Sequence, residues 1–227
     1  MWAVLKKEFK TYFLSPIGYV FIGLFLAMFS LLFYIITIYS GTVTYQAVFY
    51  NAVMYILIFI VPLLTMRMFA EERKTGTEQL LITSPRSMVG ITIGKFLAAT
   101  LVVVITELLT LVYLGVLCYF KLPDLPTVAV TMLGFLLLSM AYIAFGMFIS
   151  SLTENQIVAA IVTIAAFVLT WLLPNLSTSF ANFSLLEKFT PFVTGVFPIT
   201  ETINLVSLTA MFIVLTIIVL KRRKLVK

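Results

Sequence analysis

Residues 66–85 read MRMFAEERKTGTEQLLITSP and hold the densest charge in the chain. The charged residues are Arg67, Glu71, Glu72, Arg73, Lys74 and Glu78, with Arg86 just beyond them. Long apolar runs lie on both sides, and an ion at the centre of a bilayer costs about 2.5–3.5 kcal/mol on insertion scales. The stretch therefore predicts a loop at a membrane face, between two membrane-spanning helices.

The loop carries helix signals of its own. Good helix formers let residues 66–74 continue the preceding span into water as an uninterrupted helix, which Gly76 can end because glycine adopts the left-handed conformation at little cost. Thr75 and Glu78 have the spacing of a capping box, which starts a second short helix. That helix ends before Pro85, since the residue preceding a proline avoids the α conformation. We expect an amphipathic surface helix that suits a groove on another protein.

The composition predicts an all-α integral membrane protein with one domain, residues 1–227. The chain is 62% hydrophobic and 11% charged, whereas soluble domains have roughly 45–50% apolar and about 25% charged residues. It has no histidine and one cysteine, Cys118, so neither a catalytic nor a metal site is predicted. The net charge of +6 sits at the ends of apolar runs and sets topology, so no nucleic-acid partner is expected.

Six membrane spans are expected, at residues 17–39, 47–68, 89–120, 127–149, 157–173 and 200–220. They match the roughly 20 residues needed to cross a bilayer. Pro62 predicts a kink in the second span, and Gly90 and Gly94 allow a close helix approach in the third. Short polar breaks are expected at residues 40–46 and 150–156.

The first 14 residues predict an amphipathic helix in the membrane interface. Trp2, Leu5, Phe9 and Phe13 recur at steps of three and four residues, with lysines between them. The alternative is a disordered positive tail.

Residues 175–199, between the fifth and sixth spans, are rich in phenylalanine and interrupted by Pro191 and Pro198. They are too broken to span the membrane. We expect them to lie in or dip into the interface; a loop resting on lipid is the alternative.

Lysine and arginine gather on one side of this topology. Both termini and the 66–90 loop carry most of them, whereas the other side has only Lys121 and Lys188. Because positive residues mark the cytoplasmic side, both termini and the loop are expected to face inward.

The run EERKTGTEQLL, followed by SP and then IGKFLA, resembles the first cytosolic loop of ABC-2 type transporter permeases, in particular the gliding-motility-associated (GldF-like) branch. The run FGMFISSLTENQIVA also resembles this family. The resemblance implies a permease of a bacterial cell membrane, with an elbow helix at residues 1–14 and short extracellular helices between spans five and six. It also implies an exporter built from two permease chains, either a homodimer or a pair of related chains.

The resemblance further implies a coupling helix within residues 70–84 that contacts a separate ATP-binding subunit. The residues implied in this contact are Glu71, Glu72, Arg73, Lys74, Gly76, Thr77, Glu78, Leu80 and Leu81. ATP and Mg²⁺ belong to that partner, and this chain binds no cofactor of its own.

The nearest approach to a phosphate-binding loop is GITIGKF at residues 90–96. It is one residue short of the ATPase motif and has Phe96 in place of the Mg²⁺-binding hydroxyl. Lys95 is therefore interpreted as an anchor at the inner surface, with an apolar stem that lets its charge reach water.

Two carboxylates fall in or near hydrocarbon. Glu107 lies deep in the third span, where it either faces a pathway or hydrogen-bonds between helices. Glu201 lies at the outer start of the sixth span, where a helix N-terminus favours an anion. An ATP-independent secondary transporter or channel, with two halves of three spans, is the alternative function.

Overall fold

The computed structural model describes residues 2–41, 44–77, 87–120, 122–176 and 184–226, and these ranges contain helices and no strand. The α-helices are α1 (Trp2–Leu14), α2 (Pro16–Phe33), α3 (Tyr45–Ala52), α4 (Ile58–Thr65), α5 (Ala70–Lys74), α7 (Met88–Phe120), α8 (Leu125–Leu152), α9 (Gln156–Leu176), α10 (Leu185–Val193) and α11 (Ile199–Val226). Two π-helical segments, Tyr34–Tyr39 and Val53–Leu57, continue α2 and join α3 to α4.

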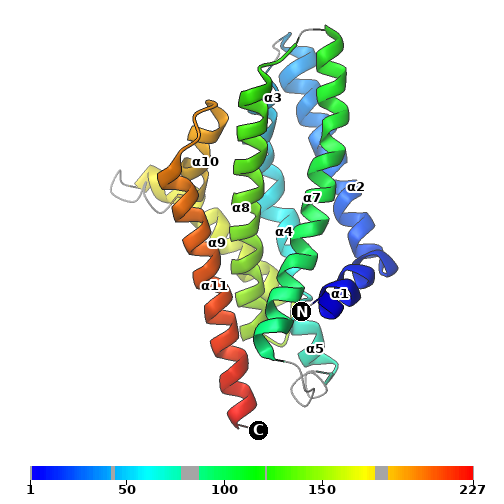
Figure 1. Ribbon diagram of the computed structural model, residues 1–227, viewed down its shortest axis with the longest axis vertical. Coiled ribbons are helices and arrows are strands. Elements are labelled where there is room, and N and C mark those ends of the chain that lie inside the picture. The colour runs from blue at the N-terminus through cyan, green and yellow to red at the C-terminus, as the bar shows by residue number, and fades with distance from the viewer. Residues whose placement is uncertain (1, 42–43, 78–86, 121, 177–183, 227) are drawn as a thin grey trace.

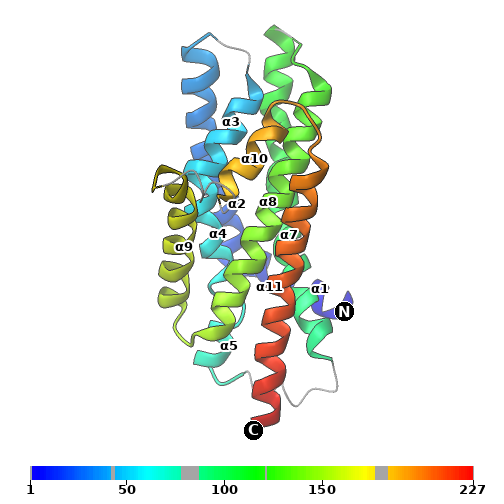
Figure 2. The same ribbon diagram turned by 90° about the vertical axis from the view of Figure 1, so that its left-hand side faces the viewer.

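Five described segments are long and apolar enough to cross a membrane: Pro16–Tyr39, Tyr45–Lys74, Met88–Phe120, Leu125–Leu152 and Ile199–Arg223. The fifth expected span corresponds to α9, whose apolar part, Gln156–Leu172, is shorter than the others. In Figure 2, α9 lies around the middle of the molecule's height, and α10 lies higher, beside α8. The expected fifth span, residues 157–173, therefore stays a prediction, whereas the expected sixth, residues 200–220, lies within the candidate span Ile199–Arg223.

Several boundaries differ from the expected ones. The break expected at residues 150–156 is reduced to residues 153–155, because α8 continues to Leu152 and α9 begins at Gln156. Helix α9 continues past residue 173, where the expected fifth span ends, with Pro174 inside it, and α11 extends beyond residue 220 into the basic tail. Charged residues end a membrane span, but they need not end the helix, because lysine and arginine are good helix formers.

The second span is divided in two places. A π-helical segment ends at Leu57, directly before Ile58. The carbonyl of Ile58 lacks its usual donor because Pro62, four residues on, has no N–H. After Thr65, residues 66–69 form a turn before α5 starts. The prediction of an uninterrupted helix over residues 66–74 is therefore wrong.

Aromatic rings fill the core where α2, α3 and α8 meet. Phe49 packs edge-on against Phe29 at 5.3 Å and against Phe135 at 5.1 Å between ring centroids. Phe25 lies 5.9 Å from Phe135. Tyr45 is fully buried and donates to the carbonyl of Thr110 on α7 at 2.8 Å. These contacts join four helices into one bundle (Figure 1).

Helix α10 is held against α8. Ser184 caps it by accepting from the backbone N–H of Glu187 at 3.3 Å. The hydroxyl of Thr131 on α8 donates to the carbonyl of Phe192 at 3.1 Å. The Phe192 ring lies over Gly134, where a Cβ would come within 2.4 Å of it. The aromatic segment thus packs on the bundle, and residues 177–183 lie outside the described part of the chain.

Both termini and α5 lie at the same end of the bundle (Figure 1). The basic residues of the loop and of the tail are therefore gathered at one end, as the lysine and arginine pattern predicts. Which side of the membrane this end faces stays a prediction.

We expect Gly134→Ala to loosen α10 from α8. The added Cβ overlaps the Phe192 ring, and overpacking of this kind costs about 1–3 kcal/mol. Thermal unfolding in detergent should show a melting temperature several degrees lower. The control is Gly23→Ala, because a Cβ at Gly23 meets nothing within 4 Å. Equal melting temperatures for the two variants would contradict the packing described.

Candidate functional site

Residues 66–77, comprising the turn, α5 and the turn that follows, form a compact unit that we name the hook. It ends as the sequence predicts: Gly76 has φ +74, and its N–H donates to the carbonyl of Arg73 at 3.1 Å. The Thr75 hydroxyl donates back to the carbonyl of Glu71 at 2.9 Å. The expected second helix, with Glu78, Leu80 and Leu81, lies outside the described residues.

Ser150 on α8 explains why the helix breaks at the hook. Its Oγ accepts from the backbone N–H groups of Phe69 and Ala70, at 3.1 and 3.2 Å. The same hydroxyl donates to the carbonyl of Met66 at 3.0 Å. One side chain thus satisfies two buried N–H groups and one partly buried carbonyl, which a continuous helix would have paired within itself.

The close approach of α8 makes this bonding possible. At Gly146, one turn before Ser150, a Cβ would lie 2.3 Å from the Oγ1 of Thr65 on α4. Any larger residue would push the helices apart. The hook therefore depends on a glycine and a serine spaced four residues apart on α8.

Arg73 ties the other side of the hook to the end of α8. Its Nη2 lies 2.6 Å from the Oε1 of Glu154, and its Nη1 donates to the carbonyl of Leu152 at 3.2 Å. We did not predict from the sequence a contact between the two runs that resemble the ABC-2 family, one containing Arg73 and the other Glu154. The available signal was that both runs are polar breaks expected on the same side of the membrane.

Lys95 on α7 is the largest departure from expectation. It is only 3% exposed and does not extend to water. Its Nζ lies 2.8 Å from Oε1 of Glu72 on the hook and 3.2 Å from Oε2 of Glu8 on α1. The ammonium also lies 5.4 Å from the centre of the Phe69 ring. Two carboxylates converge on it, and their attraction holds it inside.

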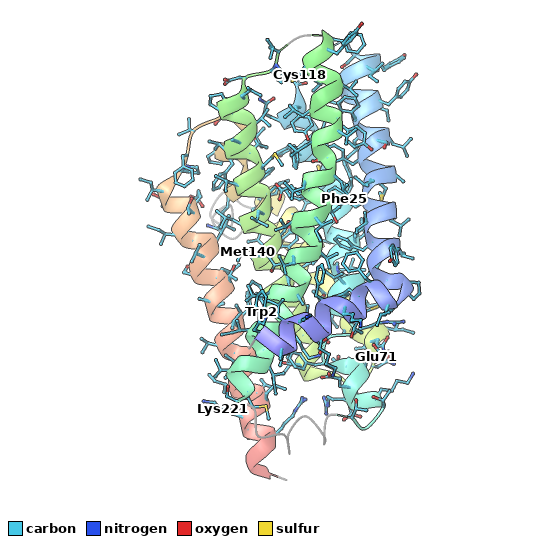
Figure 3. All side chains as sticks on the ribbon, turned by 45° about the vertical axis from the view of Figure 1, so that its right-hand side comes forward. Trp2, Phe25, Glu71, Cys118, Met140 and Lys221 are labelled. Carbon is cyan, nitrogen blue, oxygen red and sulfur yellow. The ribbon has the colours of Figure 1, made fainter. Side chains whose placement is uncertain are left out.

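Helix α1 packs across the bundle near the end that carries the hook (Figure 3). Gly94 lets it approach α7, since a Cβ there would lie 2.9 Å from the side chain of Val4. The Tyr12 hydroxyl donates to the carbonyl of Leu64 at 3.4 Å, and burial raises the pKa of the Tyr12 phenol, so it stays a neutral donor. Trp2–Leu14 is thus helical, as the spacing predicts, and its depth in a membrane stays a prediction.

The two remaining candidate carboxylates lie apart from the hook. Glu107 is buried on α7, and its Oε1 has no hydrogen-bond partner among the described residues. Glu201 lies in the first turn of α11, where its Oε2 is 3.5 Å from Nζ of Lys188 and 3.3 Å from Nδ2 of Asn204. Within the described ranges, no three side chains of His, Cys, Asp or Glu gather into a metal site.

Comparison with protein-family models matches residues 33–221 to the ABC-2 family transporter protein. The chain belongs to this family. It is therefore a multi-pass membrane permease of the ABC transporter class, whose members work with an ATP-binding subunit. The match includes the hook, α7, α8 and α9, while α1 lies before it. No curated protein matches the chain, and the gliding-motility branch stays a prediction.

We expect Lys95→Met to destabilise strongly the end of the bundle that carries the hook. The substitution leaves the largely buried carboxylates of Glu8 and Glu72 without a compensating positive charge. Removing one partner of a buried pair costs about 3–5 kcal/mol. Thermal unfolding of the purified chain measures the loss.

The triple variant Lys95→Met, Glu8→Gln, Glu72→Gln should recover most of that stability, because no charge is then left unpaired. Lys10→Met is the control, since Lys10 lies exposed on the same helix as Glu8. A single variant as stable as the control would rule out the buried pairing.

Proposed function

We propose that this chain is the membrane-spanning subunit of an exporter in a bacterial cell membrane, driven by a separate ATP-binding subunit through residues 70–84. The observation that supports this proposal is the bonding of the hook to α8 and α7, and through Lys95 to α1. A force applied to the hook then reaches three other helices as well as α4, its neighbour in the chain.

The bonds of the hook suit a rigid lever. Ser150 fixes its backbone, Arg73 fixes one flank through Glu154, and Lys95 fixes the other through Glu72. The Ser150 and Lys95 bonds are buried or partly buried, whereas the Arg73–Glu154 pair is exposed on the Glu154 side and contributes less. Displacement of α5 would therefore tilt the helices rather than bend a loop.

The geometry suggests two roles for the residues implied in partner contact. Glu72 and Arg73 are held by groups of this chain and act as anchors. Lys74, Thr75, Gly76 and Thr77 are exposed and lead into residues 78–84, so we assign the contact with the ATP-binding subunit to them together with Glu78, Leu80 and Leu81. Leu80 and Leu81 would fill an apolar groove on the ATP-binding subunit. The charged residues of the contact would fix how the two surfaces align.

In this proposal two permease chains, identical or related, face each other and form the pathway between them. ATP and Mg²⁺ bind to the two ATP-binding subunits, which close on nucleotide and move both hooks. Both termini face the cytoplasm, in keeping with the basic residues at the hook end.

Isolation of the intact complex tests the proposal. The tagged chain, expressed in its own host and purified in mild detergent, should bring down an ATP-hydrolysing protein in fixed proportion. Repeated isolation of the chain without an ATPase would instead favour an ATP-independent transporter or channel.

We expect Leu80→Asp to separate ATP hydrolysis from transport. A charge in the proposed apolar groove is unpaired, which should weaken binding of the ATP-binding subunit about tenfold or more. Co-isolation of the subunit and ATPase activity in proteoliposomes measure the effect. Leu80→Met conserves volume and should behave as wild type. Full coupling in Leu80→Asp would count against the contact.

We expect Arg73→Glu to impair coupling without removing the chain from the membrane, because it places two carboxylates side by side. Adding Glu154→Arg reverses the pair and should restore part of the activity. ATPase activity of the complex, compared between the single and double variants, gives the readout. If the double variant is no better than the single one, the Arg73–Glu154 bond has no part in coupling.

A further inference from the structure

The apolar side of α1 is already packed against the bundle. Val4 lies against Gly94 of α7, Leu5 is buried, and Phe9 and Tyr12 pack against the core. Leu5 and Phe9 belong to the set whose spacing predicts a helix in the membrane interface, yet their contacts are with protein. The side of α1 that meets its surroundings is therefore the opposite one.

The outward side of α1 carries three lysines, which we name the lysine face. Lys6, Lys7 and Lys10 are exposed, and at 3.6 residues per turn they fall within about 100° of the helix circumference. None of them forms an ion pair with a described residue. The one acidic residue of α1, Glu8, lies 3.2 Å from the ammonium of Lys95. The lysine face therefore presents positive charge that α1 itself does not neutralise.

Two features favour a membrane as the surface that the lysine face meets. Helix α1 runs across the long helices (Figure 3) and lies nearer the middle of the bundle than α5 (Figures 1 and 2). Trp2 and Leu14, at the two ends of α1, are 73% and 76% exposed. Tryptophan is enriched where membrane meets water, and apolar groups beside lysines are typical of helices that lie in that interface. A bilayer fits this combination better than the surface of a soluble protein.

The division of α1 into a packed apolar side and a free basic side selects the kind of lipid. An interfacial helix is held by its buried apolar area and by its attraction to anionic headgroups. Because the bundle covers most of the apolar area of α1, attraction between charges becomes the larger contribution. A lysine near an anionic membrane surface strengthens binding by a factor of about five. A zwitterionic headgroup has no net charge and gives no such gain.

We propose that the lysine face of α1 binds the headgroups of anionic phospholipids, with Trp2 and Leu14 resting among the upper parts of the acyl chains. Because Lys95 joins Glu8 of α1 to Glu72 of the hook, the bound lipids also hold the hook close to the membrane surface. The site goes beyond the proposed transport function, since it requires neither ATP nor a second subunit.

Fluorescence of Trp2 in bilayers tests the site, because its signal is local to α1. The chain has one other tryptophan, Trp171, and Trp171→Phe leaves Trp2 as the reporter. The full-length variant is reconstituted in phosphatidylcholine that contains brominated phosphatidylglycerol or brominated phosphatidylethanolamine with identical acyl chains. We expect the glycerol lipid to quench Trp2 by half at a mole fraction at least fivefold lower than the ethanolamine lipid. The difference should vanish in 1 M salt, where the Debye length is about 3 Å.

The triple variant Lys6→Gln, Lys7→Gln, Lys10→Gln, made in the same background, assigns the preference to the lysine face. It should quench equally with the two lipids, because the charge that attracts the anionic headgroup is gone. The three side chains are exposed and form no ion pair with a described residue, so the fold does not depend on them. An unchanged melting temperature in detergent checks this.

The matched control is the triple variant Lys74→Gln, Lys221→Gln, Arg222→Gln. It makes the same change in charge at exposed positions outside α1, so the preference of Trp2 for the glycerol lipid should remain.

The remaining outcomes would overturn the proposal. Equal quenching of the starting variant by the two lipids would show that α1 does not select anionic headgroups. A preference that persists without the three lysines would assign it to other groups. Quenching by neither lipid would place Trp2 away from the bilayer and assign the lysine face to an acidic protein surface instead.

Discussion

One buried ammonium holds together the end of the molecule where the chain is most highly charged. Lys95 bonds Glu8 and Glu72 at once, so α1, α7 and the hook meet at a single atom. Taking three charges out of water is costly, and the attraction among them repays that cost only if all three stay in place. The arrangement is therefore stabilising as a set and strongly destabilising when broken, which favours elements that move together.

The bonds around Ser150 add a second constraint of a different kind. A serine hydroxyl can donate once and accept twice, and Ser150 uses all of this capacity on the backbone of residues 66, 69 and 70. Three of the peptide groups at the break in the helix are thus bonded by one side chain. Together with Arg73, this makes the hook part of the packed bundle rather than a loop attached to it.

Hydropathy and helix signals were enough to predict the all-α class, the approximate position of five long apolar helices and the end of α5 at Gly76. They predicted these features because each depends on neighbours in the chain. The turn at residues 66–69 was missed because its cause, Ser150, lies about 80 residues away. Lys95 was misread for the same reason: a lysine near the end of a span usually reaches water, and only the fold shows that Glu8 and Glu72 come to it. The residues expected to form the second short helix, with Leu80 and Leu81, lie outside the described residues.

Helix α8 is bonded near both of its ends, to the hook at one end and to α10 at the other. Ser150 lies near its C-terminus and holds the hook, while Thr131 and Gly134 lie near its N-terminus and hold α10. An unbroken α-helix of 28 residues is about 42 Å long at 1.5 Å per residue, and over such a length a straight helix behaves as a rod. A tilt imposed on one end of α8 would therefore be carried to its other end, so this single helix joins the hook to α10.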